Sequence, residues 1–88
     1  MTTIPTIHLN GTGAKTLRDE YWAASKALDA AAEALAAATC NGRDFYPQGV
    51  AAYDQARHER DAAFHKLDEV QRYVDEILGG ICDQMRHS

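Results

Sequence analysis

The segment with the clearest chemical equipment, residues 41–49, reads Asn-Gly-Arg-Asp-Phe-Tyr-Pro-Gln-Gly. The guanidinium of Arg43 suits paired hydrogen bonds to phosphate oxygens, and the rings of Phe45 and Tyr46 offer faces on which a base can stack. Two interpretations stay open: the turn binds a nucleotide, or its rings cap a helical bundle while Arg43 pairs with Asp44. The candidate ligand-binding residues of this turn are Asn41, Arg43, Asp44, Phe45 and Tyr46.

A second candidate anion site precedes the first predicted helix, in the glycine-rich segment 11–16. Its Gly-Thr-Gly-Ala-Lys-Thr order departs from the phosphate-binding P-loop, because Ala14 stands where that loop needs a glycine before its lysine. Thr12, Lys15 and the free amides of a helix start are still able to hold an anion. The alternative is a plain helix N-cap that binds no ligand.

Arg60 interrupts the apolar stripe of the second predicted helix, where burying a guanidinium is costly unless an anion lies beside it. Asp29 or Glu33 of the first helix is one candidate partner. A ligand phosphate, reached together with Arg57, is the other. Arg57 and Arg60 therefore join the candidate ligand-binding residues.

Catalytic or metal chemistry has less support in the sequence. The four histidines are too scattered along the chain for a structural metal site. They are His8, His58, His65 and His87. No histidine is visibly paired with a Cys or Ser nucleophile, and no carboxylate pair is evident. The sequence therefore predicts a binding protein rather than an enzyme, without a metal or cofactor.

Composition narrows the class of partner and the compartment. A formal charge of −4, with acidic and basic residues interspersed, argues against general nucleic-acid binding. No apolar run approaches the roughly 20 residues that span a bilayer, and no signal peptide is evident. Two cysteines, Cys40 and Cys82, are too few to staple a small secreted domain, so both are expected to be free thiols. We expect a soluble cytoplasmic protein without a membrane partner.

The elements that must position these residues follow from the hydrophobic pattern. Apolar residues recur at alternating intervals of three and four positions, first from Leu17 and again from Tyr53. This period predicts one helix over residues 14–39 and another over residues 47–78, with Pro47 in its first turn.

Further residues indicate where the two helices begin and end. Thr16 and Asp19 have the spacing of a capping box for the first helix. Gly79 and Gly80 predict the end of the second helix, leaving residues 79–88 as a C-terminal tail.

The connection over residues 40–46 is short, so the two helices are predicted to fold into an antiparallel hairpin. In that register Leu35 lies near Tyr53, Leu28 near Arg60, and Tyr21 near Leu67.

Ahead of the hairpin, residues 1–13 form a short extended arm. Its alternating stretch Ile4–Leu9 is compatible with an edge strand.

The first helix carries a second stripe of small residues on another face. These residues are Ala23, Ala27, Ala30, Ala34 and Ala37. Because 88 residues bury only a marginal core, this face and the nearby Trp22 predict that the hairpin completes its core by oligomerisation. The predicted fold class is therefore all-α: an antiparallel two-helix hairpin with an extended N-terminal arm.

The opening Ile7-His8-Leu9-Asn10-Gly11-Thr12, the alanine-rich helix and the 41–49 turn together resemble short phage and prophage proteins. The resemblance spans residues 4 to 78. Within that group the chain looks like the anti-Thoeris and anti-CBASS sponges, which sequester cyclic-nucleotide or cyclic ADP-ribose-type immune messengers between subunits without cleaving them. The resemblance implies a homo-oligomer with a small nucleotide ligand in the host cytoplasm. It adds His8, Asn10 and Thr12 to the candidate ligand-binding residues. The runner-up is a protein-interaction module, either an inhibitor of a host protein or a helical assembly factor.

Overall fold

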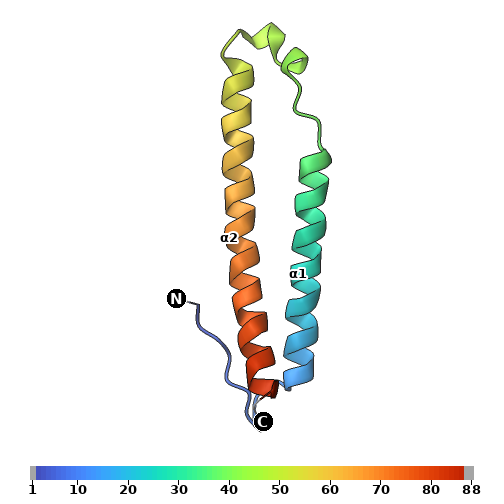
Figure 1. Ribbon diagram of the computed structural model, residues 1–88, viewed down its shortest axis with the longest axis vertical. Helices are drawn as coiled ribbons and strands as arrows, with labels where there is room; N and C mark the ends of the chain where they lie inside the picture. The colour runs from blue at the N-terminus through green and yellow to red at the C-terminus, as the bar shows by residue number, and fades with distance from the viewer. Residues whose placement is uncertain (1, 87–88) are drawn as a thin grey trace.

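The computed structural model describes residues 2–86, and this part of the chain contains two α-helices and no strand. Helix α1 spans Ala14–Ala37 and helix α2 spans Ala52–Arg86. They lie side by side and run in opposite directions, joined by a loop with two short 3₁₀ turns, η1 (Gly42–Asp44) and η2 (Tyr46–Gln48) (Figure 1). The all-α fold class is confirmed. Neither helix has the length and apolar character that crossing a membrane requires.

The two helices are staggered, so α2 extends well beyond the end of α1 in a molecule 61 Å long (Figure 1). Ser25 of α1 contacts Gln71 and Asp75, and Arg60 of α2 reaches the last turn of α1. The predicted register, with Leu35 near Tyr53, is therefore wrong by about two helical turns. Its cause is the segment 38–41, which leaves the helix early and continues toward the loop in extended conformation.

Arg60 fixes this stagger by binding the end of α1. Its two terminal guanidinium nitrogens donate hydrogen bonds to the main-chain oxygens of Leu35, Ala36 and Ala38, each over 3.0 Å. Carbonyls at a helix end lack the donor that the next turn would supply, although the Leu35 oxygen also accepts the Ala38 N–H over 3.1 Å. A cation there also interacts favourably with the helix dipole. Neutral main-chain oxygens thus take the place of the carboxylate predicted beside Arg60, so neither Asp29 nor Glu33 is its partner.

A closed polar cluster sets the register lower down, at the middle of the seam between the helices. Ser25, the one buried residue within Ala14–Ala37, donates a hydrogen bond to Asp75 Oδ1 over 2.8 Å. Gln71 Nε2 donates to Ser25 Oγ over 2.9 Å and to the same carboxylate. A buried hydroxyl costs free energy unless it is hydrogen-bonded, so sliding one helix along the other is penalised.

Helix α2 continues through Gly79 and Gly80, so the predicted helix end at these glycines is wrong. A Cβ on Gly80 would lie 2.5 Å from Cγ2 of Ile4, whereas a Cβ on Gly79 would meet nothing within 4 Å. The absence of a side chain at Gly80 therefore lets Ile4 of the N-terminal arm pack against α2. Residues 79–86 are helical. The last two residues of the predicted tail, His87 and Ser88, lie outside the described residues.

The arm packs along the outer side of α2 near its C-terminal end (Figure 1). Gln84 holds its main chain: Oε1 accepts the Ile7 N–H over 2.9 Å, and Nε2 donates to the Pro5 oxygen over 2.7 Å. The Thr2 hydroxyl donates to Glu76. The arm is extended, but within residues 2–13 it forms no strand, because a glutamine side chain replaces a neighbouring strand as its hydrogen-bonding partner.

The apolar core lies where α1, α2 and the arm meet. Among residues 2–86, the buried apolar side chains are Val74, Ile77 and Ile81, and Ile81 is 0% exposed. All three belong to the C-terminal half of α2. Burial is thus concentrated at the end of the molecule that carries the arm.

Helix α1 begins at Ala14, as predicted, but its capping differs from the prediction, and the start of α2 was predicted wrongly. Gly13 is the N-cap of α1 and makes no side-chain cap hydrogen bond, while Asp19 binds Lys15 and Arg18, so the predicted capping box is not formed. Helix α2 begins at Ala52 rather than at residue 47, and Pro47 lies in η2 instead.

The second stripe of alanines on α1 is open to solvent. Ala23, Ala27, Ala30, Ala34 and Ala37 are all exposed, and Trp22 beside them is 55% exposed. Both cysteines are free, as predicted.

Candidate functional site

A pocket of about 220 Å³ lies between the loop and the first turns of α2. Its lining residues are Cys40, Tyr53, Arg57, Arg60 and Asp61. We call it the loop-end pocket. Tyr53, Arg57 and Arg60 project from one side of α2 because they are spaced four and three residues apart. Cys40 enters from the extended segment 38–41. Two guanidiniums face one carboxylate, so the lining carries net positive charge.

The loop holds the tyrosine of this pocket in place. The rings of Phe45 and Tyr53 lie 6.2 Å apart between centroids and are tilted by 33°, a favourable aromatic arrangement. A Cβ on Gly42 would come within 3.6 Å of both Tyr46 and Tyr53, so the loop backbone passes close to these rings. Phe45 therefore supports the pocket without lining it.

Arg57 and Arg60 have different duties in the pocket. Both terminal nitrogens of Arg60 are hydrogen-bonded to main-chain oxygens at the end of α1. Its guanidinium carbon lies 5.4 Å from the centroid of the Phe64 ring. Arg57 is held loosely, 3.9 Å from Asp54 and 5.6 Å from the Tyr53 ring centroid, and its side chain is 62% exposed. Exposed ion pairs at this distance contribute little, so Arg57 is the guanidinium that is available to a ligand.

The remaining candidates of the turn lie at the same end but outside the pocket. Asn41, Arg43 and Asp44 are exposed, and Tyr46 is 74% exposed. Among the ion pairs of residues 2–86, none joins Arg43 to Asp44, although their pairing was one of the two interpretations of this turn. The loop thus presents a cation and a ring to solvent beside the loop-end pocket.

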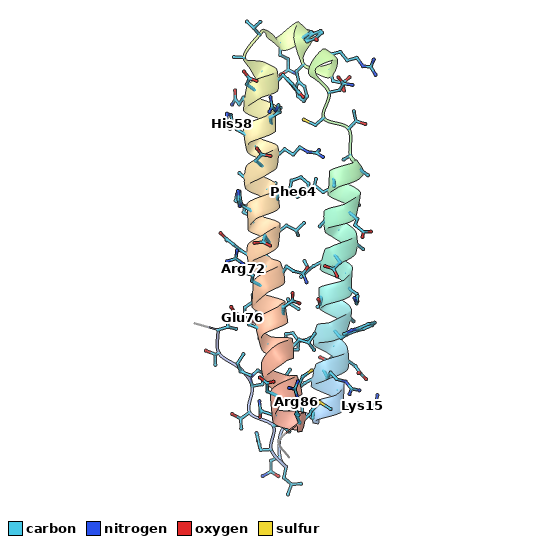
Figure 2. The ribbon with its side chains drawn as sticks, in the orientation of Figure 1. Lys15, His58, Phe64, Arg72, Glu76 and Arg86 are labelled. Atoms are coloured by element: carbon cyan, nitrogen blue, oxygen red, sulfur yellow. The ribbon has the colours of Figure 1, made fainter. Side chains whose placement is uncertain are left out.

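The candidates of the opening segment lie at the opposite end of the molecule. His8, Asn10 and Thr12 are exposed, and the Gly11 N–H closes a turn onto the His8 oxygen over 3.1 Å. Lys15 marks this end in Figure 2. The 24 residues of α1 place about 36 Å between the two groups of candidates, so one chain does not bring them together.

Lys15 already has a partner in its own chain. Its Nζ lies 2.8 Å from Asp19 Oδ2, and this hydrogen bond is the main reason that the pKa of the Asp19 carboxyl is lowered, with Arg18 adding to the effect. An anion at the start of α1 would have to compete with Asp19 for this ammonium.

Two other grooves lie along the helices, and the one at the seam is less suited to an anion because its charged lining residues are carboxylates. One, of about 250 Å³, lies along the seam beside Phe64, which sits between the helices in Figure 2, and both Asp29 and Asp68 line it. The other, of about 270 Å³, is a shallow hollow formed by Arg18, Cys82, Met85 and Arg86. Within residues 2–86 no cluster of three or more His, Cys, Asp or Glu side chains is arranged to hold a metal ion. His58, for instance, lies near the loop end of α2 (Figure 2).

Sequence reasoning missed three residues of the pocket: Cys40, Tyr53 and Asp61. Tyr53 was assigned only to the apolar stripe, although its spacing of four and seven from Arg57 and Arg60 places all three on one side of a helix. Cys40 carried no comparable pattern, because its position depends on the extended path of residues 38–41.

Comparisons with protein-family models, with curated proteins and with solved structures find no match for this chain.

Proposed function

We propose that the chain binds a small phosphate-bearing nucleotide at its loop end and holds it without converting it. The observation that carries this proposal is the meeting of Arg57, Arg60 and Tyr53 around one pocket. Guanidiniums are the side chains best suited to phosphate, and aromatic rings suit a base. Arg43 and Tyr46, exposed on the adjoining loop, supply a third cation and a second ring.

The size of the pocket supports a shared site. Pockets that enclose a small ligand usually measure about 300 to 1,000 Å³, so the loop-end pocket is large enough for a phosphate and part of a sugar only. A second copy of the chain would cover the rest of the ligand. We therefore extend the proposal to a homo-oligomer that sequesters a cyclic-nucleotide or cyclic ADP-ribose-type immune messenger, in the manner of the phage sponges that the sequence resembles.

Calorimetry with a panel of cyclic dinucleotides, cyclic oligonucleotides and cyclic ADP-ribose isomers tests the proposal. Arg57→Ala and Arg43→Ala should each weaken binding about ten- to a hundredfold, because each removes a charge-assisted contact with phosphate. Arg72→Ala is the matched control. Arg72 is also an exposed α2 arginine with a carboxylate 3.1 Å away, but it lies outside the pocket lining.

The fate of the ligand separates capture from catalysis. A bound messenger should leave the free pool and be recovered chemically intact after heat denaturation. Cleaved product would refute non-catalytic capture. If no member of the panel binds, the protein-interaction module, which the exposed alanines of α1 favour, replaces the nucleotide proposal.

A further inference from the structure

The face of α1 that points away from α2 is built almost entirely of alanine. Five exposed alanines follow one another at intervals of four, three, four and three residues. They are Ala23, Ala27, Ala30, Ala34 and Ala37. We call this surface the alanine face. Such spacing is the seam of a helix pair, and side chains this small let two helix axes approach to about 8 Å.

The alanine face is complementary to a second, inverted copy of itself. A twofold axis through Ala30 sets Ala23 against Ala37 of the second copy, and Ala27 against its Ala34. Every alanine then meets an alanine. A twofold interface needs this kind of self-match, since the same patch is used by both copies.

The charges along one edge of the alanine face match in the same arrangement. Lys26 and Glu33 lie on that edge, seven residues apart, and in an antiparallel pair residues of the same edge face each other. Rotation about Ala30 brings Lys26 opposite Glu33 of the second copy, and Glu33 opposite its Lys26. Trp22, whose ring lies 5.4 Å from the Lys26 ammonium, would extend the apolar contact on this edge. In a parallel pair, this edge of one copy would lie beside the opposite edge of the other, so neither Lys26 nor Glu33 would meet its opposite charge.

We propose that a second copy of this chain docks antiparallel on the alanine face, with the twofold axis at Ala30, and that it completes the loop-end site. The pairing of the chains stands on the alanine face and its charges alone. The completed site rests additionally on the nucleotide binding proposed above.

The second copy reaches the loop-end site because of the stagger between the helices. Lys15 lies about 22 Å from Ala30 along α1. On the other chain, seven helical residues followed by the extended segment 38–41 place Asn41 about 23 Å from Ala30. The opening residues of one copy, His8, Asn10 and Thr12, thereby come to the level of the other copy's loop. Each dimer would hold two equivalent composite sites, one at each end.

Disulfide trapping tests the register directly. In a Cys40→Ser, Cys82→Ser background, Ala30→Cys should oxidise to a cross-linked dimer, because a position on the axis faces itself at disulfide distance. Ala23→Cys alone should stay monomeric on a denaturing gel, whereas a mixture of Ala23→Cys and Ala37→Cys chains should cross-link. Cross-linking of Ala23→Cys with itself would refute the antiparallel register. A mass of 9.7 kDa by light scattering of the wild-type chain at 100 μM would refute the pairing altogether.

Charge reversal tests the edge pairs. Lys26→Glu and Glu33→Lys should each raise the dimer dissociation constant at least several-fold, and the double variant should restore it, since both pairs are then re-formed with opposite sign. Far-UV circular dichroism confirms that each variant keeps its helices. A double variant as weak as the single ones would contradict the arrangement.

Mixing experiments test the composite site, with the messenger from the calorimetric panel that binds the wild-type chain most tightly. Arg57→Ala and Lys15→Ala chains should each bind poorly alone. An equimolar mixture should recover about a quarter of the wild-type sites, because half of the dimers are mixed and each mixed dimer has one intact site. Normal binding by Lys15→Ala would refute the shared site while leaving the pairing to the cross-links. Absence of binding by the wild-type chain would refute the nucleotide proposal, and the pairing would again be decided separately.

Discussion

The two ends of this molecule are stabilised by different kinds of interaction. At the arm end, Val74, Ile77 and Ile81 of α2 are buried where the helices meet the arm, residues 2–13, and burial of apolar surface dominates. At the loop end, residues 38–64 include no buried side chain, and the structure relies on the hydrogen bonds of Arg60 and on ring contacts. Stability is therefore concentrated at one end, and the chemical groups suited to binding are concentrated at the other.

This difference teaches where the chain is able to change. Regions with little buried apolar area and many exposed hydrogen bonds open at a lower free energy than the core. The loop end should thus fray and re-form while the arm end stays folded. A ligand that bound there would order a region which is locally the weaker of the two.

The largest expected effect comes from emptying the core at the arm end. Ile81→Ala removes most of a side chain that is 0% exposed, so the free energy of unfolding should fall by about 2 to 5 kcal/mol. Val70→Ala, on the same helix but 47% exposed, is the control and should change it by less than about 0.5 kcal/mol. Urea unfolding followed by circular dichroism measures both. Equal losses for the two variants would show that the core is not where the structure places it.

At the loop end, the corresponding change is Arg60→Ala. It removes the guanidinium donor from the oxygens of Leu35, Ala36 and Ala38, of which that of Leu35 keeps the Ala38 N–H. The free energy of unfolding should fall by about 1 to 2 kcal/mol. Arg60→Lys keeps the charge but has no planar fork to span the three oxygens, so its loss should be intermediate. Amide hydrogen exchange should speed up in the last turn of α1 and stay unchanged around Ile81. Uniform acceleration along the chain would mean that the two ends do not open separately.

A smaller effect separates two adjacent glycines. Gly79→Ala meets open space and should stabilise the protein by about 0.5 to 1 kcal/mol, since alanine is the better helix former. Gly80→Ala gains the same helix propensity but drives a methyl group into Ile4, so the arm should be released and the gain cancelled. Hydrogen exchange of the Ile7 amide reports on the arm, because this N–H donates its hydrogen bond to Gln84 Oε1. If that amide stays protected in Gly80→Ala, the arm does not need a glycine at this position.

The smallest effect concerns Asp19 near the start of α1. Because the Lys15 hydrogen bond lowers its pKa in the folded protein, this carboxylate stabilises the fold above its unfolded pKa, and the contribution is lost as the pH falls through the lower folded value. The Asp19 carboxyl should titrate at lower pH in the wild type than in Lys15→Gln, as followed by NMR. Because the pair is exposed, the change in stability should be slight. Identical titration curves would show that the pair does not persist in solution.

The sequence predicted both helices and the bounds of α1 well, but it missed the bounds of α2 by five and eight residues and the relative position of the helices by about two turns. The period of three and four identifies α1 almost to the residue, since packing and propensity agree there. The register depends on Arg60 binding main-chain oxygens, and every residue offers such an oxygen, so no sequence pattern marks the partner. Gly79 and Gly80 look alike in sequence as a helix end. Only the arm, brought back from the far end of the chain, distinguishes them.

The candidate site was predictable to a similar degree. Arg57 and Arg60 were linked in advance as a pair that shares one anion, and the structure places both in the loop-end pocket. The turn residues lie beside it at the same end. The sequence did not indicate that the two arginines have different partners: Arg60 is hydrogen-bonded to the end of α1, whereas Arg57 is available to a ligand. That difference follows from the stagger of the helices, and the stagger depends on backbone geometry.

The hydrogen bonds between the arm and Gln84 also determine when the arm is able to pack during synthesis of the chain. The Ile7 amide and Gln84 are 77 residues apart along the chain. At 5 to 20 residues per second, a ribosome would make the arm about 4 to 15 s before the glutamine that binds it. Until then Ile4 and Ile7 have no surface to cover, and the two helices must pair without them. The arm is thus made before both helices and placed after they have paired.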